Sequence, residues 1–138
     1  MCFVKDIGNE CYRVAEADIE CYKVVVHGFS NDKGVYTSPY MRFNYRLGEV
    51  YDTYVCEVDG EVQSMNGFEW LNGGVFHSYR TEFDAHYLLR ETSCRCRYSR
   101  NKNIHAHILK CVIPKGSIYW ENKHEYASTA IKAVEVIV

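Results

Sequence analysis

The chain has 138 residues and a net charge of −2, so its overall charge gives no general attraction to nucleic acid or to an anionic membrane. This length suits a single domain over residues 1–138 with a hydrophobic core of its own. Seven cysteines are an odd number, and neither a secretory leader nor an apolar run of membrane length accompanies them. We therefore expect a cytoplasmic protein with reduced thiols and no membrane contact.

Short extended segments are predicted at the start of the chain. Residues 11–17 and 19–27 alternate in the manner of strands, and a polar loop at 28–34 follows them. Ser38-Pro39 interrupts residues 35–45 and excludes a central strand there, because proline cannot donate to a sheet ladder.

A hairpin is predicted around Asp59-Gly60. This dipeptide separates the extended runs 49–58 and 61–65, and type I′ turns need positive φ at both central residues. The loop that follows, 66–74, carries two rings, Phe68 and Trp70. These rings are candidates for stacking on a base or for anchoring a protein partner.

The main helix is predicted over residues 81–92, directly after a strand at 75–79. Thr81 and Asp84 have capping-box spacing, with a hydroxyl at the start and an acid three residues later. We expect an apolar face that includes the side chains of Phe83, Ala85, Tyr87, Leu88 and Leu89.

Mostly extended chain is predicted after the helix. A basic loop at 93–103 leads to a strand at 104–113, a short extended segment at 118–120 and a nearly apolar strand at 126–138. The last of these should lie inside the sheet. The fold class is therefore α+β, with a curved, mainly antiparallel sheet and one main helix at about 81–92.

Positive charge is concentrated just after the predicted helix. Four arginines and a lysine fall within thirteen residues that hold a single acid, Glu91; they are Arg90, Arg95, Arg97, Arg100 and Lys102. Guanidinium groups match phosphate oxygens bidentately, and a ring beside them can stack on a base. The predicted ligand-binding residues are Arg95, Arg97, Tyr98, Arg100, Lys102, Trp70 and His77. A solvated loop with surface arginines is the alternative.

Two other groups of residues could carry chemistry. Cys94 and Cys96 precede His105 and His107, and the histidines share a face of a strand, but one residue between cysteines is unusual for zinc. We therefore predict no metal and no cofactor. His77, Ser78 and Tyr79, with Glu82 and the distant Glu125, could form an acid–base site, of which Ser78, Tyr79 and Glu125 are the catalytic candidates.

Several stretches carry a family resemblance: Tyr22-Lys23, Ser38-Pro39-Tyr40, Val75 to Tyr79, Cys111 to Gly116, and Glu125 to Ser128. In this order they resemble small uncharacterised proteins of phages and gut bacteria, with the Pro-Lys-Gly turn and the Glu-Tyr-x-Ser strand as the most specific parts. The resemblance implies no activity, and it implies the cytoplasm of a host cell if a phage encodes the chain. A weaker likeness to ADP-ribosyltransferase-like folds places Ser78, Tyr79 and Glu125 at the catalytic positions, although the usual serine-threonine-serine run is absent.

Three functional hypotheses follow. The first is a non-enzymatic phage-type protein that binds a phosphate-bearing small molecule, such as a nucleotide signal, and counteracts host defence. The second is an enzyme that transfers ADP-ribose, and the third is an inhibitor that binds a host protein. Self-association into a homo-oligomer stays open.

Overall fold

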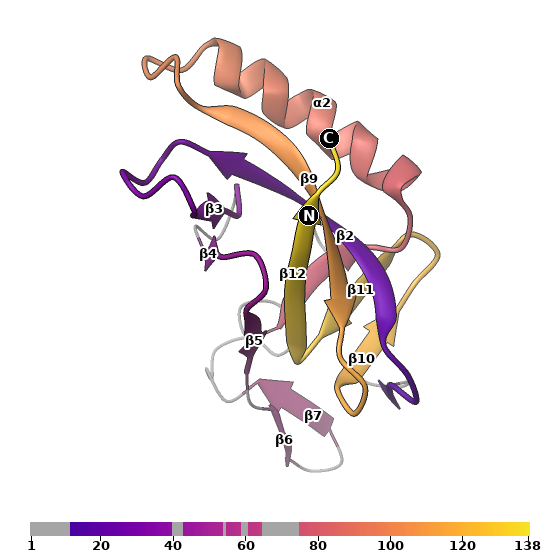
Figure 1. The fold of residues 1–138 in the computed structure, drawn as a ribbon. Coiled ribbons are helices and arrows are strands. Elements are labelled where there is room, and N and C mark those ends of the chain that lie inside the picture. The colour runs from indigo at the N-terminus through magenta and orange to yellow at the C-terminus, as the bar shows by residue number, and fades with distance from the viewer. Residues whose placement is uncertain (1–11, 40–42, 54, 59–60, 65–74) are drawn as a thin grey trace.

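The computed structural model describes residues 12–39, 43–53, 55–58, 61–64 and 75–138, whose arrangement Figure 1 shows. Ten of the described strands form one sheet with every neighbouring pair antiparallel, in the order β1-β10-β11-β8-β2-β9-β12-β5, while β3 pairs with β2 and β4. The sheet is not closed, since β1 and β5, at the two ends of this order, do not pair with each other. The strands are β1 (Arg13–Val14), β2 (Ile19–His27), β3 (Tyr36–Thr37), β4 (Asn44–Tyr45), β5 (Val50–Asp52), β8 (Phe76–Tyr79), β9 (His105–Ile113), β10 (Ile118–Glu121), β11 (Glu125–Ser128) and β12 (Ala130–Val136).

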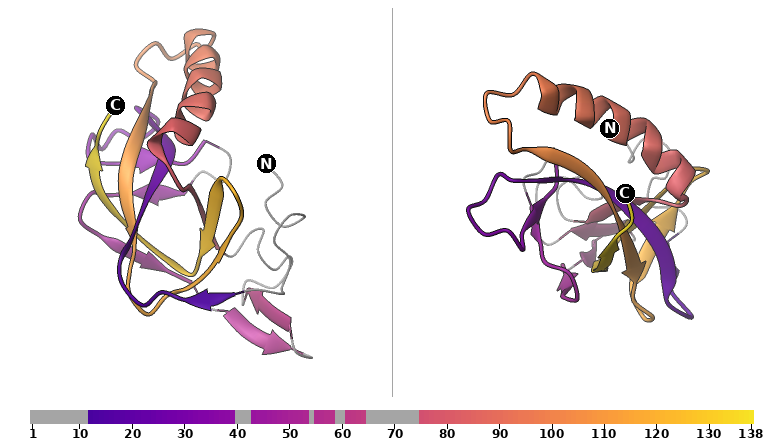
Figure 2. Two further views of the ribbon diagram at one scale, coloured as in Figure 1. Left: turned by 90° about the vertical axis from the view of Figure 1, so that its right-hand side faces the viewer. Right: turned by 45° about the horizontal axis from the view of Figure 1, so that its top comes forward.

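The predicted α+β class is confirmed in its main features, although the sheet dominates. Among the described residues the helix is α2 (Glu82–Arg97), and Figure 2 shows it running beside β9 on one side of the curled sheet. No helix in this part of the chain has both the length and the apolar character needed to cross a bilayer.

Strands β2 and β9 form the middle of the sheet and separate two layers of core. Their register pairs Ile19 with Ile113 at one end and His27 with His105 at the other. Successive side chains of a strand point to opposite faces, so one face packs against α2 and the other forms the larger core. The buried residues on the helix side are Val24, Ala85, Leu88 and Ile108, and those on the other side include Cys21, Val25, Tyr45, Phe76, Leu109, Cys111, Ile113, Tyr126 and Ile131.

The predicted start of the helix is confirmed by its cap. The Asp84 amide donates a hydrogen bond to Thr81 Oγ1 over 3.1 Å, which satisfies one of the free N–H groups of the first turn. The predicted end at residue 92 is wrong, because α2 continues to Arg97. Residues 93–97 contain no glycine or proline to stop the helix, and arginines in the last turn complement the negative end of its dipole.

The predicted apolar face of the helix is also wrong in part. Ala85 and Leu88 are buried as expected, and Thr92 is buried with them. Phe83 and Tyr87, in contrast, are 86% and 69% exposed. Both rings therefore project away from the sheet.

The hairpin predicted at Asp59-Gly60 is confirmed as a separate pair of strands, β6 (Val55–Val58) and β7 (Glu61–Ser64), which pair Val58 with Glu61.

Two predicted strands are each divided in the structure. The run 49–58 contributes β5 to the main sheet before β6 begins, and the closing run 126–138 changes neighbours between β11 and β12. Strand β12 lies between β9 and β5, inside the sheet as predicted.

Candidate phosphate-binding surface

The extension of α2 changes how the predicted basic residues are presented. Arg95 and Arg97 lie in its last turn instead of in a loop. Residues two apart on an α-helix point about 200° away from each other, so these two guanidinium groups leave the helix on different sides. Arg90 and Arg97 are seven residues apart and share the side that faces away from the sheet.

The loop after the helix is held in place by local hydrogen bonds. Lys102 Nζ donates to the Arg97 carbonyl oxygen over 2.9 Å, so this ammonium lies against the negative end of the helix. The Asn103 amide donates to Asn101 Oδ1 over 3.0 Å, and Ile104 buries its side chain below the loop. Arg100 and Tyr98 remain on the surface, and the Tyr98 side chain is 89% exposed.

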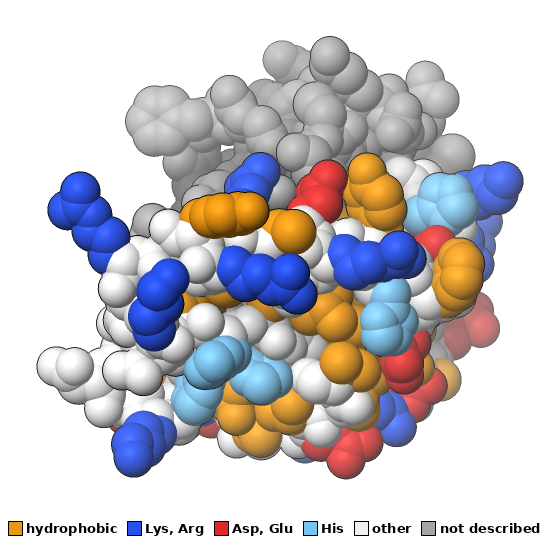
Figure 3. All heavy atoms as spheres, turned by 90° about the horizontal axis from the view of Figure 1, so that it is seen from above, with side chains coloured by type: hydrophobic (Ala, Val, Ile, Leu, Met, Phe, Trp, Pro, Cys, Tyr) orange, Lys and Arg blue, Asp and Glu red, His pale blue; other side chains and the backbone are white. Residues whose placement is uncertain are grey.

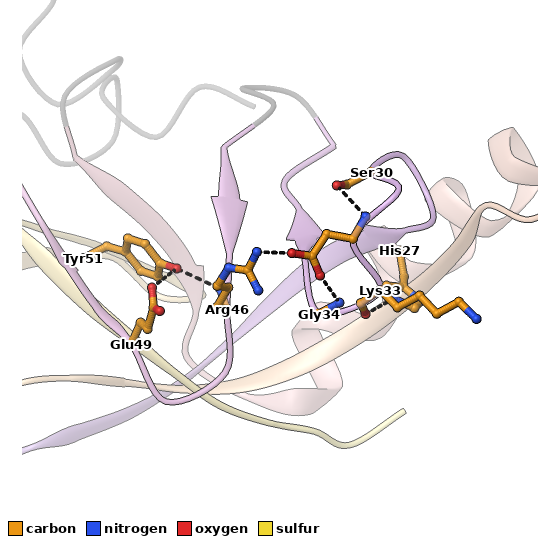
Figure 4. Close-up of polar contacts among 8 residues, drawn as sticks. His27, Ser30, Lys33, Gly34, Arg46, Glu49 and Tyr51 are labelled. Atoms are coloured by element: carbon orange, nitrogen blue, oxygen red, sulfur yellow. Dashed lines mark hydrogen bonds and ion pairs between the residues drawn. The ribbon is translucent and has the colours of Figure 1, made fainter.

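A second loop, 28–34, packs against this one at the end of β2. A Cβ atom on Gly28 would lie 2.4 Å from the Asn103 carbonyl oxygen, so the two backbones touch. Figure 4 shows the polar contacts of the second loop, toward which Arg46 points. Arg46 pairs with Asp32, whose own amide donates to Ser30 Oγ and whose carboxylate accepts from the Gly34 amide. We call the C-terminal half of α2, residues 98–104 and residues 28–34 together the basic end.

Replacing Gly28 by alanine should separate the two loops of the basic end. Gly28 has φ of +109°, where an L-residue is strained, and the added methyl group would meet backbone that cannot move away cheaply. We expect a loss of about 2 kcal/mol or more in the free energy of unfolding, measured by urea denaturation. Gly48→Ala is the matched control: its φ of +86° is also positive, but nothing lies within 4 Å of the added atom. Equal losses in the two variants would show that backbone strain alone, and not the loop contact, matters.

The charge of the basic end is strongly positive although the chain as a whole is negative. Its cations are Lys33, Arg90, Arg95, Arg97, Arg100 and Lys102, and its acids are Asp32 and Glu91. Asp32 is already paired with Arg46, and the hydrogen bonds from Arg46 and from the Gly34 amide lower the pKa of its carboxyl group. Figure 3, a view from above, shows lysine, arginine and histidine side chains spread over this face.

Histidines lie where β2 ends and β9 begins, next to the basic residues. His27 is opposite His105 in the register, and its ring stacks on Tyr36 with 4.8 Å between ring centroids. His27 Nε2 also lies 2.6 Å from the Lys33 carbonyl oxygen. His107 Nδ1 lies 3.0 Å from the Val138 carbonyl oxygen.

The cysteines and histidines considered for a metal lie on opposite sides of the sheet. Cys94 and Cys96 belong to α2, whereas His105 and His107 share the face of Leu109, which is turned away from the helix. Among the described residues, no group of three or more histidine, cysteine, aspartate or glutamate side chains is arranged to hold an ion.

The three catalytic candidates are brought together only in part. Tyr79 of β8 lies directly opposite Glu125 of β11, whereas Ser78, as the neighbour of Tyr79, points to the other face and is buried. His77 is also on β8, which meets β2 at Tyr22, far along that strand from the basic end. Trp70 and Phe68 lie outside the described residues.

The most unusual polar group of the described core is Lys23, which was not among the predicted site residues. Its side chain is 9% exposed, donates a hydrogen bond to the His77 carbonyl oxygen and lies 5.4 Å above the ring of Tyr45. Burial lowers the pKa of this amine and raises the pKa of the neighbouring Cys21 to about 11. The sequence signal for this burial was a lysine between Cys21 and the apolar residues 24–26. A lysine on an exposed edge strand would give the same sequence pattern.

Comparisons with known proteins add no family to this description: no family model matches the chain, and neither a curated protein nor a solved structure is significantly similar to it.

Proposed function

We propose that the basic end of this protein binds a phosphate-bearing small molecule, with a nucleotide signal as the leading candidate, and that it does so without chemical turnover. The observation that carries the proposal is the number of cations on three segments, α2, the loop 98–104 and the loop 28–34, of which the two loops touch at Gly28 and Asn103. One of the two acids of the basic end is paired within the protein. A polyanion therefore meets a nearly uniform positive field.

The residues of the basic end would contact the ligand in different ways. Arg100, Arg97 and Lys33 are exposed and would pair with phosphate oxygens. Lys102 acts less directly, because its ammonium already binds the helix end. The exposed ring of Tyr98 would stack on the base.

A biological role follows from the same proposal. On the resemblance to phage proteins, the protein sequesters a nucleotide signal and so counteracts a host defence. Such a role requires binding alone, and neither Tyr79 nor Glu125 takes part in it.

The proposal is tested by calorimetry against linear and cyclic nucleotides at low salt. The double variant Lys33→Glu/Arg100→Glu should weaken binding by about 100-fold or more, since each reversal replaces an attraction by a repulsion. The matched control is Lys115→Glu/Lys123→Glu, which reverses two exposed lysines in the turns after β9 and β10. Absence of binding across the panel, or an equal loss in the control, would overturn the proposal.

A further inference from the structure

The outward side of α2 displays large rings and arginines in a single row. The row consists of Phe83, Tyr87, Arg90, Cys94, Arg97 and Tyr98, and we call it the outer face of α2. Each member of the row lies three or four residues from another member, and this spacing keeps the side chains on one side of the helix. Figure 3 shows hydrophobic side chains beside the basic ones on the surface seen from above.

These rings contribute little to folding. The buried residues of α2 are Ala85, Leu88 and Thr92, on the opposite side of the helix. Phe83, Tyr87 and Tyr98 are all more than two-thirds exposed. A row of exposed rings rimmed by polar groups is typical of a surface that a partner covers.

The charges beside the rings indicate which kind of partner fits. Arg90 and Arg97 are the charged members of the row, and both are positive. The acids beside the row are Glu82, 3.1 Å from His86, Asp84, 3.2 Å from His124, and Glu91, which follows Arg90 directly. The row also leads directly to Arg100 and the rest of the basic end. The partner should therefore carry negative charge opposite Arg90 and Arg97.

Among anionic partners, single-stranded nucleic acid matches the alternation of rings and guanidinium groups best. Unpaired bases offer flat apolar faces to the rings, while a duplex keeps those faces stacked inside and would leave the rings without a partner. The distance along the helix from Phe83 to Tyr98 is about 22 Å at 1.5 Å per residue, which is room for several nucleotides.

We propose that the outer face of α2 binds single-stranded nucleic acid, with bases stacked on Phe83, Tyr87 and Tyr98 and phosphates paired with Arg90 and Arg97. This inference rests on the proposed function, because the basic end supplies the adjoining phosphate contacts. The face reads no particular sequence, since every base has a ring surface to stack. Binding weakens steeply as salt is added, because phosphate contacts release bound counterions.

The test is fluorescence anisotropy with a labelled oligothymidylate of about 12 nucleotides, a length within the range of known single-strand sites. Phe83→Ala/Tyr87→Ala should weaken binding at least about tenfold, as expected for the loss of stacking. Phe83→Tyr/Tyr87→Phe keeps both rings and should bind within about twofold of the original protein. Both variants should bind small nucleotides as before, because neither residue belongs to the basic end.

Each other outcome contradicts the inference in a recognisable way. Binding of small nucleotides without binding of the oligonucleotide would refute this inference and leave the proposed function intact, whereas absence of both would refute the two together. Equal affinity for a duplex, with no effect of removing the rings, would show general attraction of polyanions. Equal, ring-dependent binding of polyglutamate would assign the face to an acidic protein.

Discussion

Replacing Lys23 by methionine is expected to raise the free energy of unfolding at pH 7 by about 1–3 kcal/mol. The amine is buried in the described core beside Cys21, Cys111 and the ring of Tyr45, and it donates a hydrogen bond to the His77 carbonyl oxygen. Taking a cationic group out of water costs several kcal/mol, and one hydrogen bond from that group returns only about 1.5–3 kcal/mol. Methionine fills a similar volume without that cost.

The advantage of the Lys23→Met variant should depend on pH in a defined direction. Burial lowers the pKa of Lys23 below its unfolded value of 10.5, so the unfolded chain binds more protons between the two values. The stability of the original protein therefore gains from this residue as pH rises toward 10.5, and the difference between the two proteins should shrink. The raised pKa values of Cys21, Cys111 and Tyr45 lower stability above about pH 9 in both proteins. Lys23 also lowers the pKa of Cys21 and of Cys111, so the comparison is made below pH 9, where both thiols are protonated in the folded and unfolded states.

The measurement is urea denaturation of both proteins from pH 6 to just below pH 9. Lys110→Met is the control, since Lys110 lies on the neighbouring strand, is partly exposed and pairs with Glu20 over 2.7 Å. An exposed pair contributes at most about 1 kcal/mol, so this variant should be unchanged or slightly less stable. If Lys23→Met is less stable than the original protein, Lys23 makes an interaction that outweighs its burial.

Replacing Trp120 by alanine should destabilise the protein by about 3–5 kcal/mol. Trp120 is completely buried on β10, where it lies opposite Ala127 of β11 and within 6.4 Å of the Tyr12 ring, measured between ring centroids. Its removal takes the largest fully buried side chain from the described core. The loss combines the hydrophobic transfer energy of the ring with the cavity that remains.

A more conservative change at the same position separates the ring from its polar atom. Trp120 Nε1 is buried and has no hydrogen-bond partner among the described residues, so Trp120→Phe removes a donor along with part of the ring. We expect it to cost about 1–2 kcal/mol, clearly less than alanine. Phe83→Ala removes a ring that is 86% exposed and should change stability by less than about 0.5 kcal/mol. Thermal and urea unfolding measure all three; a cost of Trp120→Phe equal to that of alanine would show that the indole N–H has a partner.

Local signals in the sequence determined where several elements begin and turn. Thr81 and Asp84 specified the start of α2 through contacts within four residues. Asp59-Gly60 specified the hairpin of β6 and β7, and Ser38-Pro39 excluded a central strand, in agreement with the end of β3 at Thr37. Cap and turn geometry depends on neighbouring residues, so the sequence is sufficient to predict it. The accumulation of basic residues after position 89 is likewise a property of the sequence alone.

Tertiary structure alone decided what each side chain faces. The sequence could not show that Lys23 would be buried opposite Leu109, because that position depends on the pairing of two strands more than eighty residues apart. Nor could it show that Phe83 and Tyr87 would point outward, since that depends on which side of α2 meets β9. The helix continues past the buried Thr92 to Arg97, which places Arg95 and Arg97 on different sides of it. Burial and register are set by distant parts of the chain, and a local pattern does not contain them.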